Sequence, residues 1–137
     1  MCLTCRDPRP NIADDDIVVY KVVTVFRGKF RAAIQRNQYY EPGKTYSQPE
    51  VFDNIEVVLY SQGTIVRIYE GYHSYSNFEA AKFTAIQLCS PYNRAEQVIL
   101  KCIIPKGAKY FCGEDWHANE RCSDKLEVVE EVYRTKW

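Results

Sequence analysis

Hydrophobic residues along this chain fall mostly into short β-branched or alternating runs separated by turn residues. Residues 17–26 form a valine-rich run that is typical of a buried strand. Arg27-Gly28-Lys29 follows as a turn signal, and the residues from Phe30 on are expected to return as a second strand. The core is therefore predicted to begin with a β-hairpin at Ile17.

Further strand signals recur along the rest of the chain. A Pro-Gly turn at 42–43 precedes a short extended piece. The other expected strands are 51–60 with a break at 53–54, 64–69, 97–104 and, after a loop at 112–123, 126–132.

One helix is signalled in the middle of the chain. Ser76 and Glu79 have the spacing of a capping box, in which each side chain bonds the other residue's backbone amide. The helix is expected from about Asn77 to Cys89. Its apolar face is expected to consist of Phe78, Ala81, Ala85 and Leu88.

These elements predict an α+β fold: a mostly antiparallel β domain of six to eight strands with one principal helix near residues 77–89. The 137 residues suffice for one core. Prolines and the acidic run at 14–16 oppose regular structure near the N-terminus. We therefore expect an irregular N-terminal arm at 1–16 and a single β-rich domain at 17–137.

Charge and hydropathy narrow the function classes. The 18 basic and 18 acidic residues cancel, which argues against general nucleic-acid binding. No apolar run approaches the roughly 20 residues of a membrane span, and the first residues lack a signal-peptide core. A cytoplasmic protein with reduced thiols and no membrane partner is expected.

The chain holds 11 tyrosines. Aromatic residues suit pleated sheets, and tyrosine is also frequent at binding surfaces, so both interpretations stay open. A β-rich chain with exposed tyrosines often self-associates through a sheet edge, and a homo-oligomer is one expected form.

The cysteines suggest a metal site or unpaired thiols. Cys2 and Cys5 form a Cys-x-x-Cys pair that suits zinc, with Cys112 and Cys122 as weak candidates for the other ligands, beside His117. The spacing from Cys112 to Cys122 is long for a compact zinc knuckle, so reduced thiols are the main expectation and a disulfide between them the lesser one.

His73 lies just before the predicted helix, where amide groups favour an anion or a polar ligand. With Tyr72, Ser74 and Tyr75 it could line a pocket; alternatively, it closes the strand-to-helix turn through a backbone hydrogen bond. His117 is expected to be exposed to solvent. The sequence shows no catalytic triad, phosphate loop or dinucleotide fingerprint.

Several distinctive motifs are spread along the chain: Met1-Cys2, Asp16-Ile17-Val18-Val19-Tyr20-Lys21, Gly43-Lys44-Thr45-Tyr46, Glu70-Gly71-Tyr72-His73-Ser74-Tyr75 and Ile104-Pro105-Lys106-Gly107-Ala108-Lys109-Tyr110. Taken together, they resemble a group of small uncharacterised proteins of tailed phages and related mobile elements of gut bacteria. The resemblance covers nearly the whole chain and implies origin and compartment more than mechanism: the host cytoplasm or the virion.

A looser resemblance is to the ADP-ribosyltransferase-like fold, with Val19-Tyr20-Lys21 as its opening strand and 73–76 as its strand-to-helix corner. Lys21 or Arg27 stands where that fold has an anchoring arginine, and Ser123-Asp124-Lys125 where it has Glu-x-Glu. The resemblance implies an NAD-like nucleotide as ligand, and these departures imply a descendant that binds without catalysis.

The sequence thus predicts a phage-encoded, non-enzymatic binding protein, with a host-directed, counter-defence or virion-associated role. Its partner would be a host or virion protein or a nucleotide-like small molecule. The alternatives are an ADP-ribosyltransferase-like enzyme, with Asp124 or Glu127 as its acid, and a nucleotide-sequestering protein. No catalytic residue is assigned and no cofactor is expected, with zinc or an NAD-like nucleotide as the lesser alternatives. The candidate ligand-binding residues are Tyr20, Lys21, Tyr72, His73, Ser74 and Asp124.

Overall fold

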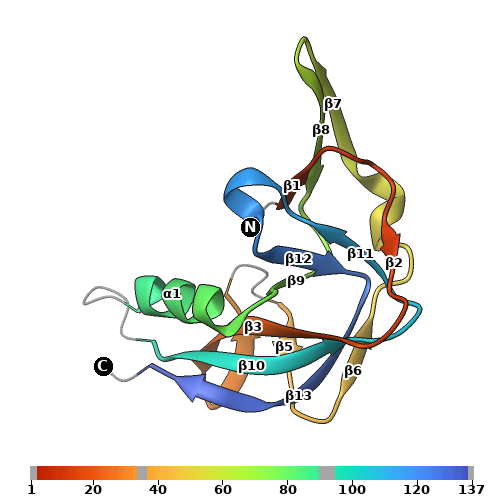
Figure 1. Ribbon diagram of the computed structural model, residues 1–137. Coiled ribbons are helices and arrows are strands. Elements are labelled where there is room, and N and C mark those ends of the chain that lie inside the picture. Colours follow the sequence, from red (N-terminus) through yellow and green to blue (C-terminus); the bar gives the residue numbers. More distant parts are fainter. Residues whose placement is uncertain (1–2, 34–36, 90–94, 136–137) are drawn as a thin grey trace.

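The computed structural model of the protein describes residues 3–33, 37–89 and 95–135. In these residues it contains thirteen strands, one α-helix and two short 3-10 helices (Figure 1). The strands are β1 (Leu3–Cys5), β2 (Asn11–Ile12), β3 (Ile17–Phe26), β4 (Lys29–Ala32), β5 (Tyr39–Tyr40), β6 (Thr45–Ser47), β7 (Glu56–Tyr60), β8 (Gly63–Ile68), β9 (Tyr72–Tyr75), β10 (Gln97–Ile104), β11 (Lys109–Cys112), β12 (Glu120–Ser123) and β13 (Lys125–Arg134). The helices are η1 (Val51–Asn54), α1 (Phe78–Leu88) and η2 (Asp115–His117).

The main sheet is antiparallel and is organised around β3 and β10. Its order is β2-β11-β12-β9-β3-β10-β13-β6, with β4 on β3 and β5 on β4. β3 and β10 pair from Ile17 with Ile104 to Thr24 with Gln97. Their alternate side chains are buried in the largest apolar cluster, which includes Val19, Val23, Val98, Leu100, Cys102 and Ile104.

The predicted opening hairpin is confirmed. Phe26 pairs with Lys29, so Arg27 and Gly28 form a two-residue turn. Both turn residues have positive φ, 52° and 76°, which is the backbone that a type I′ hairpin turn requires.

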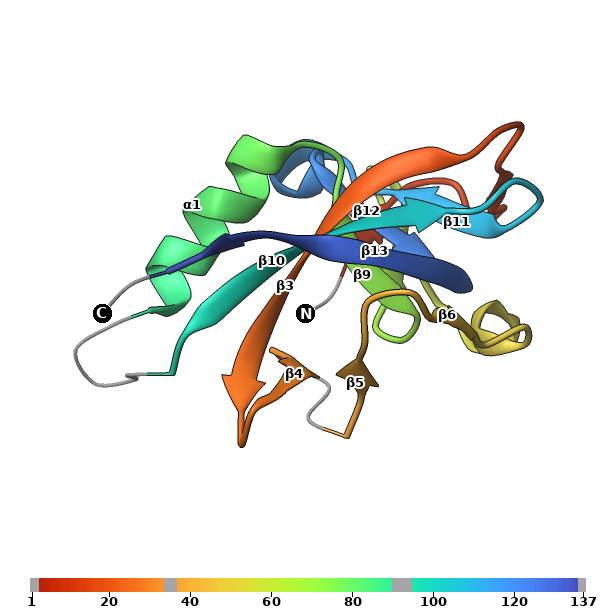
Figure 2. The same cartoon turned by 90° about the horizontal axis from the view of Figure 1, so that it is seen from below.

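Helix α1 packs on one face of β3 and β10 (Figure 2). Ala81 and Ala85 are fully buried against Val22 and Ile99, and these small side chains let the helix lie close to the sheet. The predicted helical face is correct here, but Leu88 at its end is 38% exposed.

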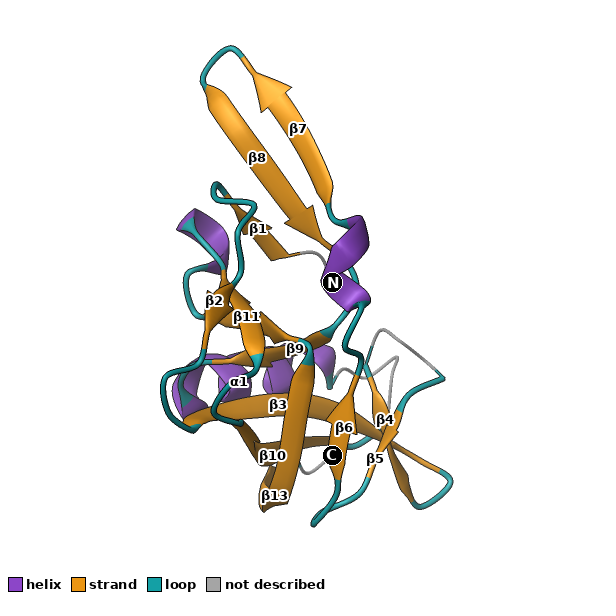
Figure 3. Cartoon of the chain, turned by 90° about the vertical axis from the view of Figure 1, so that its right-hand side faces the viewer, coloured by secondary structure: helices purple, strands orange, loops and turns teal. Residues whose placement is uncertain are grey.

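A second sheet, with the order β1-β8-β7, carries a hairpin that projects from the rest of the molecule (Figures 1 and 3). The prediction of an irregular arm over residues 1–16 is not confirmed, because β1 pairs with β8 and β2 with β11. Leu3 and Cys5 alternate into a small core with Val66 and Ile68, and this burial accounts for the strand.

The predicted mostly antiparallel fold with one helix is confirmed, but the count of six to eight strands is too low. The extra strands are pieces of two to four residues, such as β12 inside the segment predicted as a loop at 112–123. Such short strands are determined by the partner strand beside them, and a local hydrophobic pattern does not reveal them.

Candidate functional site

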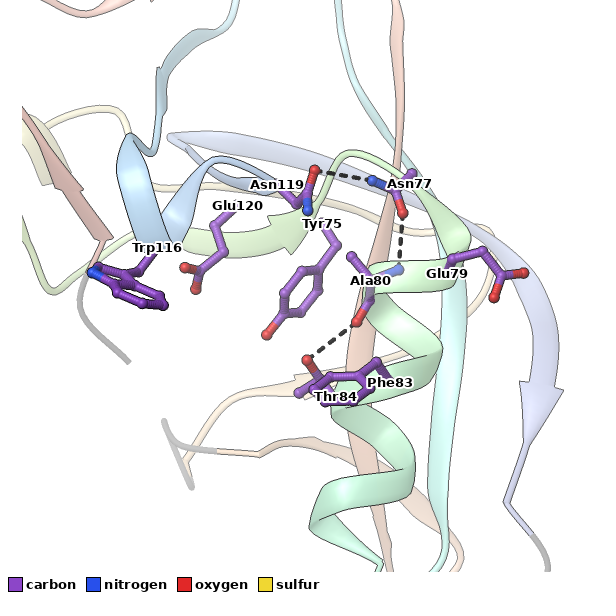
Figure 4. A pocket seen from close by; sticks show the side chains of 9 residues that line it. All are labelled: Tyr75, Asn77, Glu79, Ala80, Phe83, Thr84, Trp116, Asn119 and Glu120. Carbon is purple, nitrogen blue, oxygen red and sulfur yellow. Dashed lines mark hydrogen bonds between the residues drawn. The ribbon is translucent and has the colours of Figure 1, made fainter.

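A cavity of about 600 Å³ lies where β9 and β12 meet the start of α1 (Figure 4). Tyr75 and Glu120 are paired across the two strands, so both side chains lie on the same face of the sheet. Trp116 from η2 stands on one side of the cavity, and Phe83 and Thr84 from α1 stand on the other. We call these five residues the Trp116 surface.

The helix wall of the cavity is fixed by an asparagine. The Asn77 side chain accepts a hydrogen bond from the Ala80 amide at 2.8 Å and donates one to Asn119 at 3.1 Å. The Ser76 amide donates to the Asn119 carbonyl at 2.7 Å. The predicted capping box of Ser76 and Glu79 is therefore wrong by one residue, because Asn77 takes the N-cap position.

The loop between β11 and β12 is held from several sides. The Glu114 amide donates to the Thr4 carbonyl and the Gly113 amide donates to the Glu120 carbonyl, both at 3.0 Å. The ring Nδ1 of His117 pairs with the Glu120 carboxylate. His117 was predicted to be exposed, but this contact leaves it half-buried. The contact also fixes the loop to β12.

This anchored loop displays an indole to solvent. Trp116 is 98% exposed. Asp115 before it has φ of 56°, a left-handed conformation that is costly for a non-glycine residue. A side chain at Gly113 would collide with the carbonyl oxygen of His117. The backbone around Trp116 is thus tightly folded although its side chain is free.

Lys21, a predicted ligand-binding residue, is buried in the core. Its ammonium donates to the His73 carbonyl at 2.6 Å and lies 5.1 Å from the centroid of the Tyr40 ring. Burial lowers the pKa of Lys21 to about 8, and the thiols of Cys102 and Cys122 oppose that shift. β3 and β9 share a single residue pair. The Lys21 hydrogen bond therefore links the two strands next to the point where their pairing ends.

His73 is half-buried. Its ring Nε2 is 3.0 Å from the Tyr69 carbonyl and 3.6 Å from Cys122 Sγ. Burial lowers the pKa of His73 to about 4, and the Lys21 ammonium shifts it in the same direction. Burial also raises the pKa of the Cys122 thiol far above its usual range. The structure thus forms a Cys–His contact that the sequence did not indicate, but both groups are neutral at pH 7.

The other predicted site residues lie in separate places. Tyr20 packs against Phe78 under α1, with ring centroids 5.8 Å apart. Tyr72 is buried in the main core, and Ser74 lies buried on the face of β9 that Tyr72 occupies. Asp124 accepts a hydrogen bond from the Lys109 amide at 3.0 Å. These side chains do not line one open pocket.

The candidate zinc ligands among the described residues also do not form an open site. Cys5 and Cys122 share the small apolar core, and burial raises the pKa of Cys5 to about 11. Cys112 and Cys122 are both free thiols. Within the described residues, no group of three or more His, Cys, Asp or Glu side chains could hold a metal ion. Cys2 lies outside the described residues.

Of the cavity residues, Tyr75 was predicted to line a pocket with His73, and Glu79 was placed in the capping box. Trp116 and Glu120 lie in the segment predicted as a loop at 112–123, and Phe83 falls on the polar face of the helix, so these three were not predicted as site residues. The available signal was a tryptophan within a polar loop, which is a costly residue to leave exposed unless it has a partner.

Comparison with known proteins gives no match: no protein-family model matches the chain, nor does any curated protein or any solved structure. In the described part of the chain, no helix combines the length and apolar character needed to cross a membrane. The functional conclusion therefore rests on the geometry of the site.

Proposed function

We propose that the protein is a non-enzymatic binding protein that docks a partner protein through the Trp116 surface. The observation that carries this proposal is the 98% exposure of Trp116 on a loop tied to both β1 and β12. Tryptophan is among the residues most enriched at the energetic centres of protein interfaces.

The anchoring of the loop favours binding because little conformational freedom remains to be lost there. The hydrogen bonds of Glu114 and the His117–Glu120 contact fix the backbone before a partner arrives. A loop whose backbone is already fixed loses less conformational entropy on binding than a mobile loop. Phe83, 66% exposed across the cavity, extends the apolar contact area.

ADP-ribosyl transfer receives less support. Tyr20 and Tyr72, expected around one nucleotide, belong to different apolar clusters, and Asp124 caps a backbone amide. Phage origin and a host or virion partner remain predictions from the sequence resemblance.

The proposal is tested by affinity capture with matched variants. Wild type, Trp116→Ala and Leu59→Ala would be immobilised and exposed to the same extract of candidate partners. Leu59 is 80% exposed on the projecting hairpin, away from the cavity, so its variant controls for loss of any surface apolar group. A captured partner is then purified and its affinity measured by calorimetry.

We expect Trp116→Ala to weaken that affinity by at least about tenfold, while Leu59→Ala leaves it unchanged. Equal affinity of wild type and Trp116→Ala would refute docking through this surface. Consumption of NAD by the purified protein would instead favour the enzyme alternative.

A further inference from the structure

We infer that the Trp116 surface binds the guanidinium group of an arginine side chain on the partner protein. This inference rests on the proposed function and adds the chemistry of the ligand. It is carried by the combination of aromatic walls with a buried carboxylate between them.

The walls suit a flat group. Trp116 and Phe83 present exposed rings on opposite sides of the cavity, and Tyr75 lies between them (Figure 4). The cavity of about 600 Å³ has room for an arginine side chain with part of its backbone. A planar cation gains both stacking and electrostatic attraction on aromatic faces.

A carboxylate lies at the base of the cavity. Glu120 is 8% exposed, and its carboxylate points into the space between Trp116 and Tyr75 (Figure 4). It pairs with His117 Nδ1 through Oε2. A carboxylate has about four acceptor positions, so it can still receive hydrogen bonds from a donor that enters the cavity.

Except for His117, which contacts Oε2 of Glu120, the basic side chains of the neighbouring elements are directed elsewhere. The Arg121 guanidinium donates to the Ala118 and Glu120 carbonyls at 2.9 Å, and Lys82 Nζ lies 5.5 Å from the Tyr133 ring centroid. Neither residue lines the cavity. A cation that reaches the other oxygen of Glu120, Oε1, from the cavity would therefore come from the partner.

Other ligand classes fit less well. A phosphate would approach Glu120 against its charge, which disfavours a nucleotide in this cavity. A lysine ammonium would satisfy the charge but has no planar face to stack between Trp116 and Phe83.

The test uses small probes and the intrinsic fluorescence of Trp116. Trp137 is replaced by phenylalanine so that Trp116 is the one remaining indole. Nα-acetyl-arginine amide, Nα-acetyl-lysine amide and AMP are titrated separately. We expect saturable quenching by the arginine probe, with about fivefold weaker binding of the lysine probe and weaker still of AMP.

Two carboxylate variants separate a specific contact from general acidity. Glu79 also lines the cavity, but its carboxylate points away from the interior (Figure 4). Glu120→Gln should weaken the arginine probe by about fivefold or more, and Glu79→Gln by less than about twofold. Phe83→Ala, at an exposed position, removes one aromatic wall without touching the His117 contact and should weaken it about threefold.

Tighter binding of AMP than of the arginine probe would overturn the inference. So would equal effects of Glu120→Gln and Glu79→Gln in folded variants, or an unchanged affinity in Phe83→Ala. None of these results decides the proposed docking function. That function is tested separately by the affinity of Trp116→Ala for the intact partner.

Discussion

β9 and β12 pair along four residues each. One end of this pair is open to solvent, and the other is buried. At one end, Tyr75 and Glu120 open onto a cavity beside an exposed tryptophan. Toward the other end, Cys122 is buried in the small core with residues of β1 and β8, and the half-buried His73 contacts its thiol. Both ends carry groups that can ionise, so residue type alone does not tell a site from a structural cluster.

Burial separates the two ends. The enclosed end includes Lys21 and His73, whose pKa values fall because a charge is poorly solvated there, and Cys122, whose pKa rises for the same reason. The hydroxyl groups of Ser74 and Ser123 are buried nearby without a hydrogen-bond partner among the described residues. We therefore assign a structural role to the enclosed end and propose that the ligand binds at the open end.

The largest expected effect comes from breaking the enclosed end at Gly71. Its φ is +102°, and an added Cβ would lie 2.7 Å from Cys122 Sγ. Gly71→Ala should lower the free energy of unfolding by about 4 kcal/mol, from backbone strain plus overpacking. Urea denaturation measures this.

Gly43→Ala is the matched control. Its φ is +86°, but a Cβ there would meet nothing within 4 Å. It should cost only about 1 kcal/mol of backbone strain. Similar losses in the two variants would mean that Gly71 is not tightly enclosed.

The next largest effect is a pH dependence of the free energy of unfolding that is caused by His73. Its folded-state pKa of about 4 lies below the unfolded value of 6.5, so the unfolded state binds more protons as the pH falls between these values. The stability contributed by the neutral ring is present above pH 6.5 and lost toward pH 4, by up to about 3 kcal/mol. Denaturation curves between pH 4 and 7 measure the loss.

His73→Gln should flatten this dependence while the contributions of the carboxylates remain. The difference between wild type and variant therefore isolates the histidine. An identical slope in both proteins would show that His73 titrates normally and is open to water.

A smaller effect is expected in thiol reactivity. Cys5, Cys102 and Cys122 are buried with raised pKa values, whereas Cys89 and Cys112 are half-buried. At pH 8 the first three should be alkylated at least about a hundredfold more slowly than in denaturant, because the thiolate is the reactive form and must first be exposed. Peptide mass spectrometry follows each thiol, and rapid labelling of Cys122 in the native state would argue against the enclosure.

The smallest stability effect is expected at the open end. Trp116→Ala removes a side chain that is 98% exposed, so the free energy of unfolding should change by less than about 0.5 kcal/mol. Thermal unfolding measures it. A large loss would mean that the indole packs on the protein, which would remove the contrast between the two ends.

The elements with strong local signals could be predicted from the sequence. The β-branched run of β3, the turn at Arg27-Gly28 and the bounds of β10 follow from patterns that depend on neighbouring residues alone. β1 and β12 could not, because each is short and exists through its partner strand.

The candidate site was harder to predict. Lys21 was a candidate because it stands where the ADP-ribosyltransferase-like fold has an anchoring arginine, whereas in the structure it links β3 to β9. Trp116 and Phe83 are 33 positions apart along the chain and approach each other only when β9 and β12 pair. No local pattern in the sequence indicates that these two side chains come close together.

The position of β3 has a consequence for the time course of folding. Of its neighbours in the main sheet, β4 is adjacent along the chain, but β9 and β10 come from the second half. During synthesis the valine-rich strand can form its hairpin early, yet it must wait for β10 before its other edge is covered. Sheets built from such distant pairings fold slowly, and the nascent chain is exposed to aggregation during that wait.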